Sequence, residues 1–187
     1  FRSVAPTIDN QLDRLLFCYD RLIDDSDRFI ASLDRIAKKN TDTLTLQKVQ
    51  FQKASIYAHL ASKETHPDYN QRAIAILDSI VAKNNHSNTY KQALLKRNEI
   101  ADKQLTVTIP EFLYDRQHAR ALVQYKNVDT LKVSFYKTTL AAMKSSEYDN
   151  HERTVLVDSL VKFHQPAQSF VQVLPSHSDY FNHTTEV

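Results

Sequence analysis

Apolar residues recur three or four positions apart from residue 9 to residue 101, which is the spacing of the buried face of an amphipathic helix. Short polar breaks divide this pattern into predicted helices over residues 9–23, 26–39, 44–62, 69–83 and 87–101. Helices of this length that are joined by short turns cannot bury their apolar faces alone. We therefore expect them to stack as antiparallel hairpins.

The third to fifth predicted helices loosely resemble a tetratricopeptide unit. Ala54 and Tyr57 lie in the third helix, and Ala73 and Leu77 lie in the fourth helix across the intervening turn. The glycine and proline of that repeat are missing from their usual positions. The pattern predicts a degenerate repeat, and an irregular helical bundle without repeat ancestry stays open as the alternative.

After the fifth predicted helix, apolar residues recur at every second position, which is typical of a half-buried strand. Residues 105–109 alternate in this way, and Pro110 ends the strand because proline cannot donate a hydrogen bond to a sheet. Two further alternating segments, 119–125 and 131–135, predict a β-hairpin with its turn at Asn127.

The last fifty residues carry weaker strand signals. Residues 169–174 predict a strand that Pro175 closes, and residues 184–187 are compatible with the start of another. The pattern over residues 139–168 favours neither helix nor strand. Three or four strands are too few for a two-layer sandwich, which commonly has about seven. We therefore expect the sheet to be incomplete at residue 187 and to be completed by further chain or by another segment.

These patterns predict an α+β chain of two domains. Residues 1–103 are expected to form antiparallel, degenerate tetratricopeptide-like helical hairpins. Residues 104–187 are expected to form an antiparallel β-sandwich domain that is truncated at its C-terminal end.

The composition excludes several classes of function. The 187 residues include no glycine, which excludes a glycine-rich phosphate loop, a dinucleotide-binding fingerprint and a glycine nucleophile elbow. Tight turns and helix ends must then use asparagine or aspartate, and we expect this at Asn40, Asn84, Asn85 and Asn127. No apolar run approaches the roughly 20 residues of a membrane span, so no transmembrane segment is expected.

The charge is small and evenly spread. The net charge is +2, and no basic stripe or tail is present, so we expect no nucleic-acid partner. The single cysteine, Cys18, cannot form an internal disulfide and is expected to be a buried thiol on a helix.

The most suggestive cluster of titratable residues is His177, Asp179 and His183. Two imidazoles and a carboxylate within seven residues could bind zinc or nickel if the loop folds back on itself. A short turn rich in histidine and aspartate is more often a solvated or hydrogen-bonded corner. The expectation is therefore that the chain holds no metal and no other cofactor.

Other reactive or recognition residues do not form a motif. His118, His151 and His164 are scattered, and no serine or cysteine lies in a nucleophile motif beside them, so we do not expect an enzyme. Most aromatic residues fall on the apolar stripes. Four others are candidates for an exposed contact surface: Phe112, Tyr114, Tyr148 and Phe181.

Three segments in this order resemble the N-terminal region of alpha-2-macroglobulin-like proteins from bacteria of the Bacteroides group. They are AIAILDSIVAKNNHSNTYKQALLKRNEIADKQL, LTVTIPEFLYDRQHARALVQYKNVDTLKVSFYKT and SFVQVLPSHSDYFNHTTEV. In those proteins a helical repeat segment leads into the first macroglobulin-type, immunoglobulin-like β-sandwich domain. Here Ser178 stands where the family usually has a glycine, and Cys18 lacks the downstream Glu-Gln partner of a reactive thioester, so no reactive residue is carried over.

The resemblance implies a structural and interaction module within a large exported protein that presents a bait segment and traps proteases. Its partners would be the rest of the parent polypeptide and, through the parent, proteases. The resemblance also implies the periplasm or cell envelope, with lipid anchoring through the parent in some relatives. The alternative is a stand-alone helical-repeat scaffold that binds peptides or cell-envelope partners in a concave groove.

Overall fold

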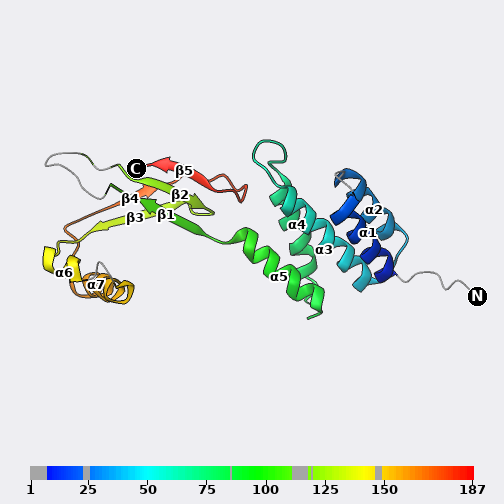
Figure 1. The fold of residues 1–187 in the computed structure, drawn as a ribbon, viewed down its shortest axis with the longest axis horizontal. Helices are drawn as coiled ribbons and strands as arrows, with labels where there is room; N and C mark the ends of the chain where they lie inside the picture. Colours follow the sequence, from blue (N-terminus) through cyan, green and yellow to red (C-terminus); the bar gives the residue numbers. More distant parts are fainter. Residues whose placement is uncertain (1–7, 23–25, 85, 111–117, 119, 146–148) are drawn as a thin grey trace, which may run out of the picture. The chain divides into compact units, whose positions relative to one another are not determined.

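The computed structural model describes residues 8–22, 26–84, 86–110, 118, 120–145 and 149–187, and it has an α+β fold (Figure 1). The chain divides into two compact units. The helical unit consists of Phe1–Gln104 and His177–His183, and the strand unit consists of Leu105–Ser176 and Thr184–Val187. Residues 177–183, which the sequence placed in the second domain, therefore belong to the helical unit.

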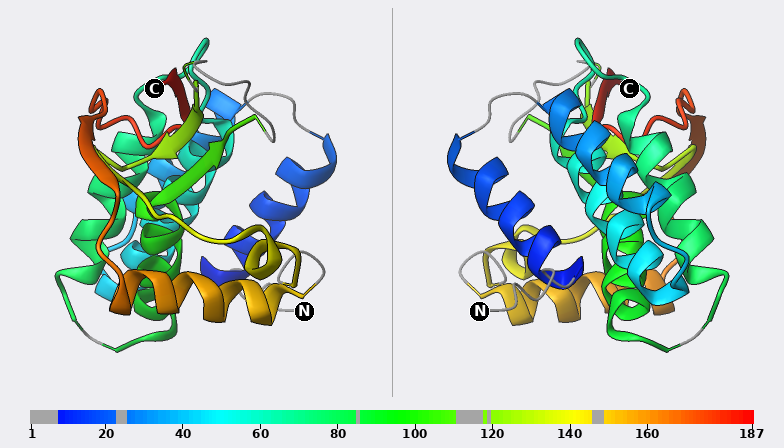
Figure 2. Two further views of the ribbon diagram at one scale, coloured as in Figure 1. Left: turned by 90° about the vertical axis from the view of Figure 1, so that its left-hand side faces the viewer. Right: turned by 90° about the vertical axis from the view of Figure 1, so that its right-hand side faces the viewer.

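The helical unit contains five helices, close to the ranges that the apolar spacing predicts. They are α1 (Ile8–Leu22), α2 (Ser26–Lys38), α3 (Thr43–Leu60), α4 (Tyr69–Val81) and α5 (Asn88–Ala101). Successive helices contact one another, and the two views of Figure 2 show α3, α4 and α5 side by side. Each helix buries an apolar stripe against its neighbour. This packing stabilises the helices, because a single helix of this length is only marginally stable in water.

Two clusters of buried apolar side chains hold these helices together. The α3–α5 cluster consists of Ala54, Tyr57, Ala73, Ile74, Leu77, Ile80, Ala93 and Ile100. The α1–α3 cluster consists of Leu12, Phe29, Leu33, Val49 and Ile56. The positions that suggested a tetratricopeptide unit all lie in the first cluster. Close helix packing alone accounts for the small side chains of Ala54 and Ala73, so their burial does not require repeat ancestry.

Polar side chains replace glycine at the helix ends. Asn40 donates a side-chain hydrogen bond to the carbonyl of Ile36 at 2.7 Å, which satisfies an open carbonyl where α2 ends. Asn84 follows α4 with a left-handed φ of 43°, as predicted. The Ser87 hydroxyl accepts a hydrogen bond from the amide of Tyr90 at 3.1 Å and caps α5. Asn85 lies outside the described residues.

Asp42 caps α3 in the same way, since its carboxylate accepts a hydrogen bond from the amide of Thr45 at 2.8 Å. Hydrogen bonds from Thr45 hold the pKa of the Asp42 carboxyl below its ordinary value. A carboxyl group with a lowered folded-state pKa stabilises the fold above its unfolded pKa of about 3.9. This contribution is lost as the pH falls through the folded-state value.

We therefore expect the stability of the wild-type chain to fall relative to an Asp42→Asn variant as the pH drops below about 4. Asparagine caps a helix about as well as aspartate but does not titrate, so the variant is a matched reference. Urea denaturation followed by circular dichroism at a series of pH values measures the difference. A difference that stays constant from neutral pH into the acid range would contradict the prediction.

The strand unit contains two small sheets and a helical insertion. Its elements are β1 (Gln104–Thr108), β2 (Leu122–Lys126), β3 (Thr130–Phe135), α6 (Leu140–Ser145), α7 (Asn150–Phe163), β4 (Gln168–Val173) and β5 (His183–Glu186). One sheet has the strand order β1-β2-β5, and the other pairs β3 with β4. The ambiguous stretch 139–168 thus contains two helices, while the predicted strands at 169–174 and 184–187 are confirmed.

The predicted β-hairpin between β2 and β3 is wrong, because these strands belong to different sheets. Asn127 has the expected left-handed φ of 54°, but no neighbouring residue has a positive φ. A two-residue type I′ hairpin turn needs two successive residues with positive φ, and the β-branched Val128 opposes this. The chain instead passes to the other sheet, where β3 pairs antiparallel with β4 and Leu131 lies opposite Gln172.

A small core joins the two sheets. Val123 and Tyr125 of β2 are buried with Leu131 of β3 and Leu174, which follows β4. The Tyr125 hydroxyl donates a hydrogen bond to the carbonyl of Pro175 at 3.0 Å. Few other side chains of this unit are covered: α7 buries none, and every residue of β1 and β4 is exposed. The alternation over residues 105–109 therefore predicts a strand correctly but not its burial.

Candidate functional site

The segment 177–183 is held against the helical unit by hydrogen bonds to its backbone. The side-chain amide of Asn70 donates to the carbonyl of Asp179 at 3.3 Å, and that of Gln71 donates to the carbonyl of Ser178 at 3.0 Å. Both donors lie in the first turn of α4. The Lys63 ammonium also donates to the carbonyl of Asn182, and Tyr180 packs against the α3–α5 cluster.

The backbone of this segment folds back on itself at two left-handed residues. Ser178 has φ 50° and Tyr180 has φ 60°, a conformation that costs energy for residues with a Cβ atom. Asp179 lies between them, and its carboxylate accepts a hydrogen bond from the amide of Phe181 at 3.0 Å. The missing glycine at position 178 therefore does not prevent the turn, because contacts with α4 hold it.

This turn brings together the three residues that the sequence singles out. The Nε2 atom of His183 lies 2.9 Å and 3.1 Å from the two carboxylate oxygens of Asp179. The rings of His177 and His183 are stacked with their centroids 3.8 Å apart and an angle of 15° between their planes. One possible ligand atom from each residue lies within 4.8 Å of the other two.

The cluster lies at the surface but is partly shielded. The side chain of His183 is 18% exposed and that of Asp179 is 25% exposed, whereas His177 is exposed. Partial burial acts to raise the pKa of the Asp179 carboxyl. Hydrogen bonds from His183 and from the Phe181 amide, and the charges of His183 and His177, outweigh this effect and hold the pKa below its ordinary value. Asp179 is therefore a carboxylate near neutral pH.

The other sequence candidates do not join this cluster. Within the described residues, His177, Asp179 and His183 form the one group of three or more metal-ligand side chains that lie close enough to hold an ion. His118, His151 and His164 lie outside it. Of the four proposed contact residues, Phe112, Tyr114 and Tyr148 lie outside the described residues, and Phe181 is half-buried. Cys18 lies on α1, where it is half-buried.

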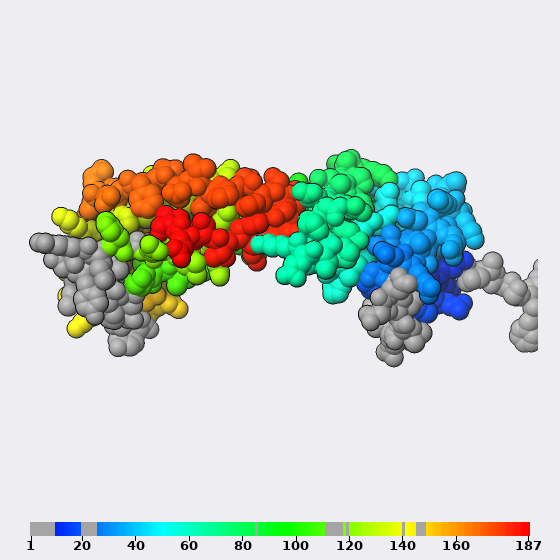
Figure 3. Space-filling view, turned by 90° about the horizontal axis from the view of Figure 1, so that it is seen from above, coloured from blue at the N-terminus to red at the C-terminus, as the bar shows by residue number. Residues whose placement is uncertain are grey.

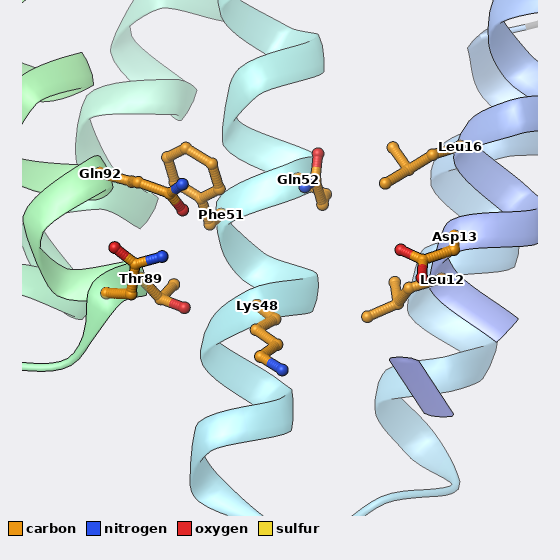
Figure 4. A pocket seen from close by; sticks show the side chains of 9 residues that line it. Leu12, Asp13, Leu16, Lys48, Phe51, Gln52, Thr89 and Gln92 are labelled. Carbon is orange, nitrogen blue, oxygen red and sulfur yellow. The ribbon is translucent and has the colours of Figure 1, made fainter. Parts of the chain in front are cut away.

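A groove in the helical unit is a second candidate, and its lining residues were not predicted from the sequence. It has a volume of about 350 Å³. Its lining comes from α1 (Leu12, Asp13, Leu16), α3 (Lys48, Phe51, Gln52) and α5 (Asn88, Thr89, Gln92). Figure 4 shows side chains of α1 and α5 on opposite sides of α3. Polar residues far apart in the sequence meet here only because the helices stack.

The third candidate is the uncovered apolar surface of the strand unit. Of the sixteen exposed large hydrophobic residues in the described part of the chain, thirteen lie between Leu105 and Ser176. Val171 and Val173 of β4 are 61% and 71% exposed. Figure 3 shows β4, in orange, at the surface of the strand unit. Exposed apolar side chains that gather in one contiguous patch are typical of an interface, and β4 supplies neighbouring ones.

Comparisons with protein-family models, with curated proteins and with solved structures found no match for this chain. No helix in the described ranges combines the length and the apolar character that crossing a membrane requires.

Proposed function

We propose that this chain is a structural and interaction module of a large exported protein of the alpha-2-macroglobulin-like, protease-trapping class, and that it has no chemistry of its own. The helical unit then serves as a base. The strand unit then belongs to a β-sandwich domain that more of the parent polypeptide completes. The protein class rests on the resemblance of residues 73–138 and 169–187. The interaction role rests on the exposed apolar surface of the strand unit.

Strand β4 is the observation that carries the interaction role. Within the described ranges it pairs with β3 alone, and no described strand lies along its other edge. Its sequence, QSFVQV, has neither a charge nor a proline, the devices that normally protect an open edge. A sheet of two strands is also marginal on its own. A further strand of the parent polypeptide beside β4 would satisfy the backbone groups of that edge, and further chain packed on the sheet face would cover Val171 and Val173.

The resemblance also supplies the proposed surroundings. A protease-trapping parent of this class lies in the periplasm or the cell envelope and can be anchored by a lipid. Proteases would then meet the parent protein and not this module alone. In that setting the module contributes shape and contact area, which agrees with a surface rich in exposed aliphatic side chains.

An immunoblot of fractionated native cells, with an antibody raised against this chain, tests the existence of the parent. We expect a band many times larger than the 21.6 kDa of this chain, in the envelope fraction. A soluble band near 21.6 kDa would contradict the proposal.

Cysteine labelling then tests whether the parent covers β4. In a Cys18→Ser background, Val173→Cys is expected to react rapidly with a maleimide in the isolated chain and to be protected in the parent protein. Leu95→Cys is the matched control, because Leu95 is 71% exposed on α5, and it should react in both. Equally rapid labelling of Val173→Cys in the parent would show that no further strand covers this face.

The groove between α1, α3 and α5 favours a second candidate function, a stand-alone helical scaffold that binds peptides or cell-envelope partners. Leu12, Leu16 and Phe51 supply apolar contacts there, and Asp13 and Lys48 supply charges of both signs (Figure 4). Such a mixed lining suits an extended peptide or a helix. A soluble band near 21.6 kDa in the fractionation experiment would make this groove the leading candidate.

A further inference from the structure

We propose that His177, Asp179 and His183 bind one divalent transition-metal ion, with zinc as the ion that best suits their chemistry. This site would be additional to the interaction role and does not depend on it. It lies wholly within the helical unit, because all three residues belong to the segment 177–183.

The donor set selects the class of ion. Imidazole nitrogen suits zinc, copper, iron and nickel, whereas calcium and magnesium prefer an all-oxygen shell. Two histidines and one carboxylate are a common three-ligand set for zinc, and the fourth position is then left for water. His177 is exposed, so the side of the cluster toward solvent is open to an entering ion and its water.

The distances need only a small adjustment. Bonds of about 2.0–2.1 Å in a tetrahedral site place neighbouring ligand atoms about 3.3 Å apart. His183 Nε2 and the nearer oxygen of Asp179 are 2.9 Å apart, slightly closer than this. The three ligand atoms all lie within 4.8 Å of one another. We expect the change to fall mainly on His177, which is exposed and whose ring would turn from its nearly parallel stack on His183 to another staggered rotamer.

The backbone that carries the ligands is already ordered. Asn70 and Gln71 hold the carbonyls of Asp179 and Ser178, so binding would not have to order the loop. The Phe181 amide donates to the Asp179 carboxylate, an outer contact of the kind that orients a metal-binding carboxylate.

One positive group lies close by. The Lys63 ammonium donates to the carbonyl of Asn182, within the same segment. This contact is exposed, so solvent and salt screen its repulsion of a cation. Asp179 is itself a proposed ligand and lies 2.9 Å from another, His183. Its carboxylate would therefore touch the ion, and its attraction for the ion is stronger than the repulsion by Lys63.

Isothermal titration of the untagged, chelator-treated full chain with a zinc salt alone tests the proposal. We expect one zinc ion per chain. His177→Ala and His183→Ala should each weaken binding by at least about tenfold, since even outer-shell contacts change metal affinity by ten- to a hundredfold. His177→Ala is the cleaner variant, because His177 is exposed and its described contact is ring stacking. Circular dichroism checks that both variants remain folded.

His151→Ala is the control, since His151 lies at the start of α7 and outside the cluster. It should bind zinc as the wild type does. Titration with cobalt gives a second readout, because a tetrahedral site with two histidines and a carboxylate colours the ion and His177→Ala should remove that absorption. Absence of zinc binding, or binding that His177→Ala and His183→Ala leave unchanged, would overturn the proposal. Neither result bears on the envelope fractionation, so the two proposals fail separately.

Discussion

Replacing Phe29 by alanine is expected to lower the free energy of unfolding of the helical unit by about 3–5 kcal/mol. The Phe29 side chain is 1% exposed and lies in the α1–α3 cluster, where its ring centroid is 4.4 Å from that of Tyr19. Removing the ring loses the free energy that is gained when the ring leaves water for the core. It also leaves a cavity that the surrounding helices fill only in part. Urea denaturation followed by far-ultraviolet circular dichroism measures the change.

The matched control is Phe17→Ala on the preceding helix, α1. Phe17 is 56% exposed, so we expect its replacement to change the stability much less, by no more than about 1 kcal/mol. Similar losses for the two variants would mean that the α1–α3 cluster does not contribute as its burial indicates. This comparison also tests whether α1 and α2 pack as described, because Phe29 contacts residues of α1.

Replacing Leu77 by alanine is expected to destabilise the helical unit by about 2–5 kcal/mol. Leu77 is fully buried in α4, at the centre of the α3–α5 cluster, with Ala73 and Ile80 on the same helix face. Neighbouring small residues such as Ala93 cannot expand to fill the space, so we expect little relaxation and an effect toward the upper part of this range.

Two variants bracket this prediction. Leu77→Met nearly conserves volume and is expected to cost less than about 1.5 kcal/mol. Leu95→Ala removes the same atoms from a side chain that is largely exposed on α5, so its effect is expected to stay within about 0.5 kcal/mol. If Leu95→Ala proved as damaging as Leu77→Ala, the division between core and surface of the α3–α5 region would be wrong.

The two candidate interaction surfaces differ in what they require of the rest of the protein. The groove between α1, α3 and α5 is complete within the helical unit and needs only a ligand. The apolar face of the strand unit is not covered by the described residues, and α7 adds no buried side chain to it. This contrast is the physical basis for preferring an interaction module over a free-standing scaffold.

Residues close together in sequence were sufficient to predict the helices. Apolar spacing located the five helices α1–α5, and the expected use of asparagine located helix ends at Asn40 and Asn84. These features follow from contacts within one or two turns, which the local sequence encodes directly. The helices α6 and α7 were missed because the apolar residues over 139–168 show no clear period, and α7 buries none of its side chains.

Pairing between strands was less predictable. The strands over 105–109 and 169–174 follow from local sequence patterns, and 184–187 was compatible with a strand, but these patterns carry no information about which strands become neighbours. The short connection at Asn127 favoured a hairpin, yet β3 pairs with β4, which is more than thirty residues away. The exposure of β1 and β4 likewise depends on what lies beside them and not on their own sequence.

The sequence by itself determined the five helices α1–α5, most of the strands and the identity of His177, Asp179 and His183 as possible ligands. Only the tertiary structure decided that these three side chains converge, because the amides of Asn70 and Gln71, more than a hundred residues earlier, hold the turn that aligns them. It also decided that residues 177–183 belong to the helical unit and that the side chains of β1 and β4 are exposed. Helix formation depends on neighbours in sequence, whereas docking, strand pairing and burial depend on distant segments that no local pattern specifies.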